Sequence, residues 1–216
     1  MPDDKDLSHE DIVAELRRLI DVVRTSDVTS AGSEGVDLDA VMADMRRARE
    51  ALAPHVVDDM RTAAGLRSND RLGGSDGLFD DVVGHVEPAD LLPYSPVIGP
   101  LNPISPPFEF WVDGEEVRGV GSFAAVHSGP PSSVHGGIAS LILDEVMALT
   151  SIVNRAQGYT GTLIVRYEAL VPLDNELTVR GFVDRTEGRK TWIGSELRAG
   201  DEVVTTAEGL FIRPRD

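Results

Sequence analysis

The sequence contains no cysteine, which excludes disulfide bonds, thiolate nucleophiles and cysteine–zinc sites together. Long apolar runs are missing too: no stretch approaches the roughly 18 residues that indicate a membrane-spanning helix. The first residues, MPDDKDLSHEDI, are acidic and lack the apolar centre of a secretory signal. We therefore expect a cytoplasmic protein with no membrane span.

Basic residues are scarce: the chain has 37 acidic and 20 basic residues, for a net charge of −17, and its two lysines are Lys5 and Lys190. Such a surface repels a phosphate backbone, so we expect no nucleic-acid partner. Apart from His135, the histidines are too scattered to indicate a metal site; they are His9, His55, His85 and His127. No nucleotide-binding glycine motif stands in a strand–helix context. We expect neither a metal nor a redox cofactor.

The first part of the chain, residues 1–66, has the periodicity of helices. Apolar residues recur at helical spacing in AELRRLIDVVR and again in DLDAVMADMRRAREAL. Asp37 or Asp39 is a candidate N-cap of the second helix, and Pro54 should kink or end it. We expect a helical arm packed on the following domain or on a partner subunit. A DNA-reading helix pair is the alternative, and the 15 acids against 8 bases in this stretch argue against it.

A polar, glycine-rich linker is predicted over residues 67–94, and a folded domain over 95–216. Six of the thirteen prolines fall between residues 91 and 107, which predicts an extended surface segment leading into the domain. Strand patterns follow: a hairpin around Asp113-Gly114, then four more strands, the last two joined at Gly200-Asp201. One long helix is predicted, over 135–153. The result is an α+β fold, an antiparallel sheet wrapped around one central helix.

The predicted central helix has two distinct faces. An apolar stripe should face the sheet; it consists of Ile138, Ile142, Val146, Leu149 and Val153. Asp144 falls on the other side, along a stripe of small residues formed by Gly137, Ser140, Ala148 and Ser151. The simplest interpretation is a solvated acid. An exposed face usually carries long charged residues, however, and this stripe has none, which favours space for a ligand or another backbone above Asp144.

Two glycines, Gly136 and Gly137, stand where this helix begins. The first turn of a helix has unpaired N–H groups and the positive end of the helix dipole. Without a Cβ, the backbone admits a close approach by a carbonyl oxygen. The pattern therefore indicates a donor site for a developing oxyanion.

These motifs resemble a known family. VHGGIASLILDEV is similar to the signature of hotdog-fold acyl-CoA thioesterases of the PaaI-type branch; GPPSSVHGG, RYEALVPL and TEGRK agree with it, and the resemblance covers roughly residues 95–214. It implies a hotdog fold in which five or six antiparallel strands wrap one long helix. It also implies a homodimer or dimer of dimers, with the site at the subunit interface and acyl-CoA as the substrate.

The resemblance assigns roles to several residues. Asp144 would be the general base or nucleophile, the Gly136 N–H would polarise the thioester carbonyl, and His135 would help to set the loop. Thr160 matches a hydroxyl that orients water from the facing subunit, and Thr162 stands close by in the sequence. For His135 a role as catalytic base is the alternative.

Two departures from the family concern the loop before the helix. Relatives often carry an acid before Gly-Pro-Pro, where this chain has His127-Ser128, and another group has asparagine where this chain has Gly129.

Other polar residues suggest substrate contacts. Coenzyme A is polyanionic and needs a local positive patch, for which Arg189 and Lys190 are the candidates, with Arg155 and Arg166 behind them. Gly137 and Ser140 are further candidate substrate contacts. Glu145 is interpreted as an ion-pair or interface residue, with a second catalytic acid as the alternative. The sequence thus predicts an acyl-CoA thioesterase, and a non-catalytic acyl-CoA-binding sensor or scaffold remains the alternative.

Overall fold

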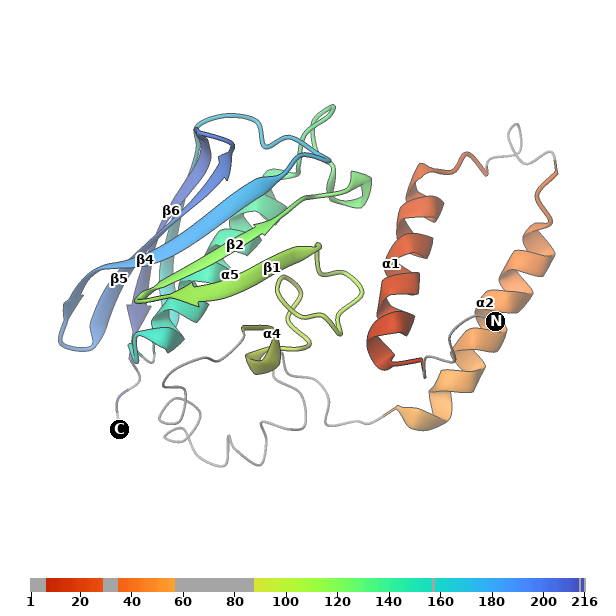
Figure 1. Cartoon of the computed structure of the whole chain (residues 1–216), viewed down its shortest axis with the longest axis horizontal. Coiled ribbons are helices and arrows are strands. Elements are labelled where there is room, and N and C mark those ends of the chain that lie inside the picture. The colour runs from red at the N-terminus through yellow and green to blue at the C-terminus, as the bar shows by residue number, and fades with distance from the viewer. Residues whose placement is uncertain (1–6, 29–34, 57–87, 157, 214, 216) are drawn as a thin grey trace.

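The computed structural model describes residues 7–28, 35–56, 88–156, 158–213 and 215. Its centre is a six-stranded sheet in the order β1-β2-β4-β5-β6-β3, with antiparallel pairing throughout (Figure 1). The strands are β1 (Phe108–Asp113), β2 (Glu116–Gly121), β3 (Tyr159–Tyr167), β4 (Leu177–Glu187), β5 (Lys190–Ala199) and β6 (Glu202–Ile212). The hairpin predicted around Asp113-Gly114 is confirmed, and Gly114 turns it with a φ of +64°.

One long helix, α5 (Gly136–Val153), packs against this sheet and confirms the predicted α+β architecture. Leu143, Val146 and Met147 are fully buried. Helix α5 and strand β4 lie so close that a Cβ added to Gly181 of β4 would clash with Thr150 Oγ1. Within the described residues, α5 alone matches a membrane span in length and hydropathy, and it is the core helix of the sheet.

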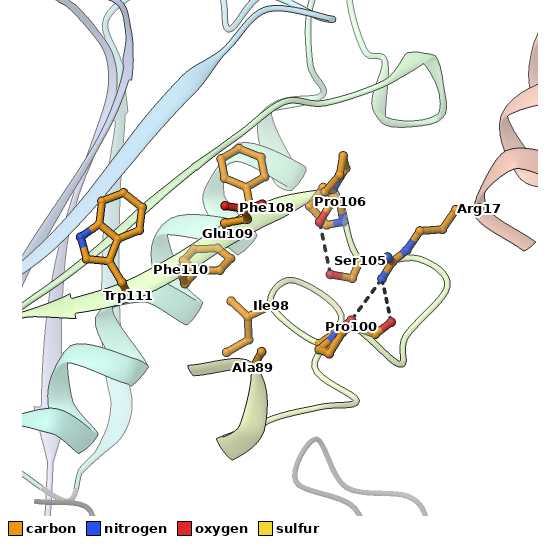
Figure 2. Close-up of a pocket in the computed structure, with 12 residues that line it drawn as sticks. Arg17, Ala89, Ile98, Pro100, Ser105, Pro106, Phe108, Glu109, Phe110 and Trp111 are labelled. Atoms are coloured by element: carbon orange, nitrogen blue, oxygen red, sulfur yellow. Dashed lines mark hydrogen bonds between the residues drawn. The ribbon is translucent and has the colours of Figure 1, made fainter. Parts of the chain in front are cut away.

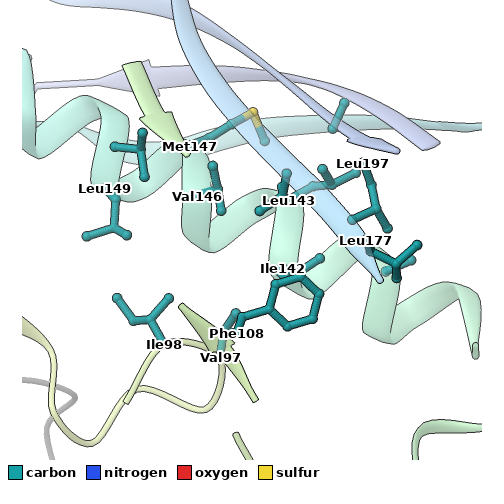
Figure 3. Packing of buried hydrophobic residues seen from close by; sticks show 14 of the residues in the cluster. Val97, Ile98, Phe108, Ile142, Leu143, Val146, Met147, Leu149, Leu177 and Leu197 are labelled. Atoms are coloured by element: carbon teal, nitrogen blue, oxygen red, sulfur yellow. The ribbon is translucent and has the colours of Figure 1, made fainter. Parts of the chain in front are cut away.

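The proline-rich segment covers another side of α5. Val97 and Ile98 have exposed fractions of 1% and 4%, and Figure 3 shows them across the helix from Met147 and Leu197. The prediction of an extended surface segment is therefore wrong for this stretch. Its apolar residues are buried on α5, and the chain folds on itself at Gly99, whose N–H donates to the Ser95 carbonyl.

A short helix, α4 (Pro88–Leu91), precedes this segment and lies within the predicted linker 67–94, whose residues 67–87 lie outside the described part. The three-part division of the chain stays a prediction.

The described part of the arm contains two α-helices, α1 (His9–Thr25) and α2 (Leu38–Leu52). Asp37 caps α2 as predicted, accepting from the Ala40 N–H at 2.9 Å, and Pro54 lies in the short 3-10 helix η1 (Ala53–His55) that follows. In Figure 1, α1 lies between the sheet and α2. No residue of α2 is buried, so α1 is the helix that packs on the domain.

Arg17 anchors α1 to the proline-rich segment. Its guanidinium donates to the carbonyls of Gly99 and Pro100 at 3.2 and 3.3 Å (Figure 2). It also donates to the Asn102 carbonyl at 2.8 Å. Nearby, Val13 is buried with an exposed fraction of 2%. The carbonyls of Gly99 and Asn102 also accept from backbone N–H groups within the segment, so Arg17 adds a second donor to turns that are already closed. The Pro100 carbonyl receives its donor from the guanidinium.

Candidate active site

The start of α5 is held by His135. This residue is the N-cap, and its ring Nδ1 accepts from the Gly137 N–H at 3.0 Å. A Cβ at Gly137 would lie 3.1 Å from the same ring nitrogen, so glycine gives the capping ring its space. The His135 N–H donates to the carbonyl of His127 at 2.9 Å, which ties the helix start to the preceding loop. This geometry agrees with a positioning role for His135.

Gly136 provides the free donor at this end of the helix. The Gly137 N–H is used by His135, whereas the Gly136 N–H has no acceptor within the described part of the chain. It lies in the first turn, where backbone donors have no partner inside the helix and the helix dipole is positive. A carbonyl oxygen placed before it would receive a fixed hydrogen bond.

Tyr167 is a residue of this region that the sequence reasoning missed. Its hydroxyl donates to the Gly136 carbonyl at 3.1 Å and lies 2.6 Å from Ser140 Oγ, which itself donates to the same carbonyl at 3.0 Å. A Cβ on Gly136 would come within 3.3 Å of the tyrosine ring. Gly136 therefore makes room for this ring, and Ser140 belongs to a hydrogen-bonded group that braces the helix start.

Asp144 is half-buried and paired with a hydroxyl. Thr160 Oγ1 donates to Asp144 Oδ1 at 3.1 Å, so the two predicted residues are brought together. The resemblance implied that the hydroxyl comes from the facing subunit. In the single chain described, the bond forms within one subunit.

A β-bulge explains why Thr160, and not Thr162, reaches the helix. In the pairing of β3 with β6, Thr160 lies opposite Phe211 and Thr162 opposite Leu210, with the register shift between them. Consecutive ladder positions point to opposite faces of a sheet. Phe211 is buried on the helix side, with an exposed fraction of 1%, so Thr160 shares that side and Thr162 points away.

Glu145 forms a structural contact that was not predicted. Ser95, a fully buried residue of the proline-rich segment, donates its hydroxyl to the Glu145 carboxylate. Ser95 Oγ in turn accepts from the N–H groups of Val97 and Ile98 at 3.2 and 3.3 Å. Burial raises the pKa of Glu145, the Ser95 hydrogen bond opposes this shift, and the charge of Asp144 adds to it. Among the described residues Glu145 has no ion pair, and its interpretation as an ion-pair or interface residue stays a prediction.

A group of basic residues gathers at the C-terminal end of α5. The Arg189 guanidinium donates to the Arg213 carbonyl at 2.7 Å, and the Arg213 guanidinium donates to the Arg155 carbonyl at 3.2 Å. Lys190 pairs with Ile212 in the adjacent strand. We call Arg155, Arg189, Lys190 and Arg213 the basic cluster. All four are exposed, and none has an acidic partner within the described ranges.

The structure thus brings together Arg155, Arg189 and Lys190 and adds Arg213, which the sequence reasoning missed. Arg166 differs, because it forms an ion pair with Glu208 at 2.6 Å. The register places Tyr159, Ile212 and Lys190 on adjacent strands, so the cluster lies at the same end of the sheet as the start of β3.

Solved structures include a protein with a similar fold. A thioesterase superfamily protein of known structure superposes with a TM-score of 0.76, at 25% identity over 96% of each chain. The chain has the hotdog fold of thioesterase superfamily proteins. No protein-family model matches the chain.

Curated relatives match the chain over a shorter region. Acyl-coenzyme A thioesterase THEM4 of Xenopus laevis is 29% identical over 87 residues, which is 39% of this chain and 39% of that protein. The corresponding protein of Bos taurus is 32% identical over 87 residues, 39% of this chain and 35% of its own length. The match thus spans less than two-fifths of these relatives.

Proposed function

We propose that this hotdog protein hydrolyses acyl-CoA thioesters to a free acid and coenzyme A. The observation that carries the proposal is the pairing of Asp144 with Thr160 on the half-buried face of α5. The curated relatives named acyl-CoA thioesterases support the same substrate class.

The helix geometry favours a site shared by two subunits. Gly136 and Asp144 are eight residues apart, which corresponds to about 12 Å along a helix at a rise of 1.5 Å per residue. One carbonyl group and one water molecule are too short to span that separation. In our proposal, Gly136 of one subunit therefore faces Asp144 and Thr160 of the other. This arrangement revises the expectation that the threonine comes from the facing subunit.

An exposed sheet edge favours the second subunit. β3 is an edge strand, and it carries Tyr159, Ile164 and Tyr167 with exposed fractions of 77%, 47% and 55%. Open edges with large apolar side chains invite strand pairing. Joining β3 to its copy would cover this edge and bring the two α5 helices close together. We propose a homodimer on this basis.

The proposed reaction is a water attack on the thioester. Asp144 accepts a proton from water as the oxygen attacks the carbonyl carbon, and Thr160 holds the carboxylate in place. Negative charge develops on the carbonyl oxygen, where the Gly136 N–H of the facing subunit stabilises it. Collapse of the intermediate breaks the C–S bond, and the CoA thiolate takes up the proton. Direct attack by Asp144 as a nucleophile is the alternative route.

The basic cluster is the proposed docking site for the phosphates of coenzyme A. On a chain with a net charge of −17, four exposed basic residues without acidic partners among the described residues form a local positive field. The cluster lies beyond Asp144 along α5 and at the β3 end that carries Thr160, which suits a substrate with its thioester at one end and phosphates at the other.

The proposal is tested by thiol release from a panel of short, long and aromatic acyl-CoAs. We expect turnover with at least one member, at a rate proportional to enzyme concentration. Calorimetry on the same panel separates the alternative function: binding without any free thiol would indicate an acyl-CoA sensor or scaffold and would refute hydrolysis.

A further inference from the structure

A cavity of about 450 Å³ lies between the arm and the hotdog domain. Four elements line it: α1, the proline-rich segment, the loop with the 3-10 helix η2 (Ala125–His127), and the first turns of α5. The α1 wall includes Ile20, the loop wall includes Phe123 and Val126, and the α5 wall includes Ile138 and Leu141. Most of the lining is therefore apolar.

Most polar side chains that line this cavity already have hydrogen-bond or ion-pair partners. The Arg17 guanidinium is hydrogen-bonded to three carbonyls of the proline-rich segment. Arg18 is paired with Glu15 at 2.8 Å, and His127 Nδ1 accepts from the Ala124 N–H at 3.2 Å. Among the described residues of the lining, Asp21 is the one carboxylate, and it lies on the α1 wall. Such a cavity suits an apolar ligand.

The cavity and the proposed site share the first turns of α5. Ile138 and Leu141 stand two and five residues after Gly136, within the first two turns of the helix. Leu141 and Gly137 are four residues apart, so they are neighbours on the helix surface. The loop wall is attached as well, because the carbonyl of His127 accepts from the N–H of His135. A group whose carbonyl lies before Gly136 thus has the apolar cavity beside it.

We propose that this cavity binds the acyl chain of the substrate and that α1 is a specificity-determining wall of it. The preferred substrates are then acyl-CoAs with an extended aliphatic chain, rather than acetyl-CoA. The inference rests on the proposed function, because it takes the Gly136 N–H as the site of the thioester carbonyl. It also gives the N-terminal arm a role in substrate selection.

The inference is tested by filling the cavity from the α1 wall. Ile20→Trp places a larger ring at the lining, whereas Val23→Trp adds the same ring on the same helix at a residue with an exposed fraction of 55% that does not line the cavity. The measured quantity is the ratio of kcat/KM for decanoyl-CoA to that for acetyl-CoA.

We expect Ile20→Trp to lower this ratio at least tenfold, because even one methylene in an apolar pocket changes discrimination by about ten- to two-hundred-fold. Val23→Trp should leave the ratio unchanged. An unchanged ratio in a folded Ile20→Trp protein overturns the inference. If that variant does not fold, Val126→Trp fills the cavity from the η2 wall, and the same criterion applies to it.

Calorimetry distinguishes failure of this inference from failure of the proposed function. If the wild-type protein releases no thiol from either substrate, hydrolysis is refuted, and the binding constants decide on the cavity. Decanoyl-CoA should then bind at least tenfold more tightly than acetyl-CoA, and Ile20→Trp should remove the difference. Equal affinities for the two ligands would overturn the acyl-chain assignment.

Discussion

Replacing Thr160 tests how the carboxylate of Asp144 is held. Thr160→Val keeps the shape of the side chain and removes the hydroxyl that donates to Asp144 at 3.1 Å. Hydrogen bonds to charged groups contribute about 1.5–3 kcal/mol, and each 1.36 kcal/mol is a factor of ten in rate. Because Thr160 is solvent-exposed in the single chain, we take the lower end and expect kcat/KM to fall about tenfold.

Two further variants sharpen this experiment. Thr160→Ser retains a hydroxyl and should restore most of the activity. Thr162→Val makes the same change two residues away, on the side of β3 that the bulge turns from the helix, and should alter kcat/KM less than twofold. The assay is thiol release from the best acyl-CoA, with circular dichroism to confirm folding. Loss of activity in Thr162→Val with full activity in Thr160→Val would refute the assignment.

Three other predictions concern charge and packing. Burial raises the pKa of Glu145 above its ordinary value of 4.5, so the stability it contributes is present at pH below 4.5 and is lost as pH rises through the folded-state pKa. Glu145→Gln should therefore raise Tm at pH 8 and leave it close to wild type at pH 4, as measured by calorimetry; a lower Tm at pH 8 would contradict this sign. Arg213→Ala should raise KM for an acyl-CoA about fivefold, as expected for an exposed contact of about 1 kcal/mol, and leave KM for the corresponding acyl-pantetheine unchanged. Arg166→Ala, which breaks an ion pair instead, is the control. An equal rise of KM in the two variants would contradict the docking of coenzyme A on the basic cluster. Leu143→Ala should lower the free energy of unfolding by about 3–5 kcal/mol, because the fully buried side chain leaves a cavity, and urea titration measures it; a loss under 1 kcal/mol would contradict the packing.

The elements of the domain follow from local patterns. Glycine turns mark the hairpin at Gly114 and the β5–β6 turn at Gly200, and the helical spacing of Ile142, Val146 and Leu149 identified a face that is buried. Each of these signals is local, because it spans only a few residues of the element that it predicts. Periodicity therefore predicted an antiparallel sheet on one helix.

The contacts around the site depend on longer-range geometry. The bulge between Thr160 and Thr162 decides which hydroxyl reaches Asp144, and a bulge has no reliable mark in a single sequence. Tyr167 joins Gly136 from β3, a contact that needs the exact register of strand and helix. The buried hydrogen bond from Ser95 to Glu145 likewise joins residues 50 positions apart.

The proline-rich segment shows where a composition rule fails. Six prolines in 17 residues predicted an exposed, extended path, because proline cannot donate a backbone hydrogen bond. Val97 and Ile98 between those prolines are nevertheless buried against α5, and Arg17 supplies donors to the nearby carbonyls. The donor comes from the arm, 85 residues away from Asn102, so the local sequence gives no sign of it.

The central claim is that the carboxylate of Asp144 activates water for thioester hydrolysis. Asp144→Asn preserves the size of the side chain, and its amide can still accept from Thr160, but it is no longer a base. General-base catalysis contributes about 10²–10⁴-fold, so kcat for the best acyl-CoA should fall by at least a hundredfold while substrate binding and folding are retained. A folded Asp144→Asn protein with kcat close to that of the wild type would contradict the account.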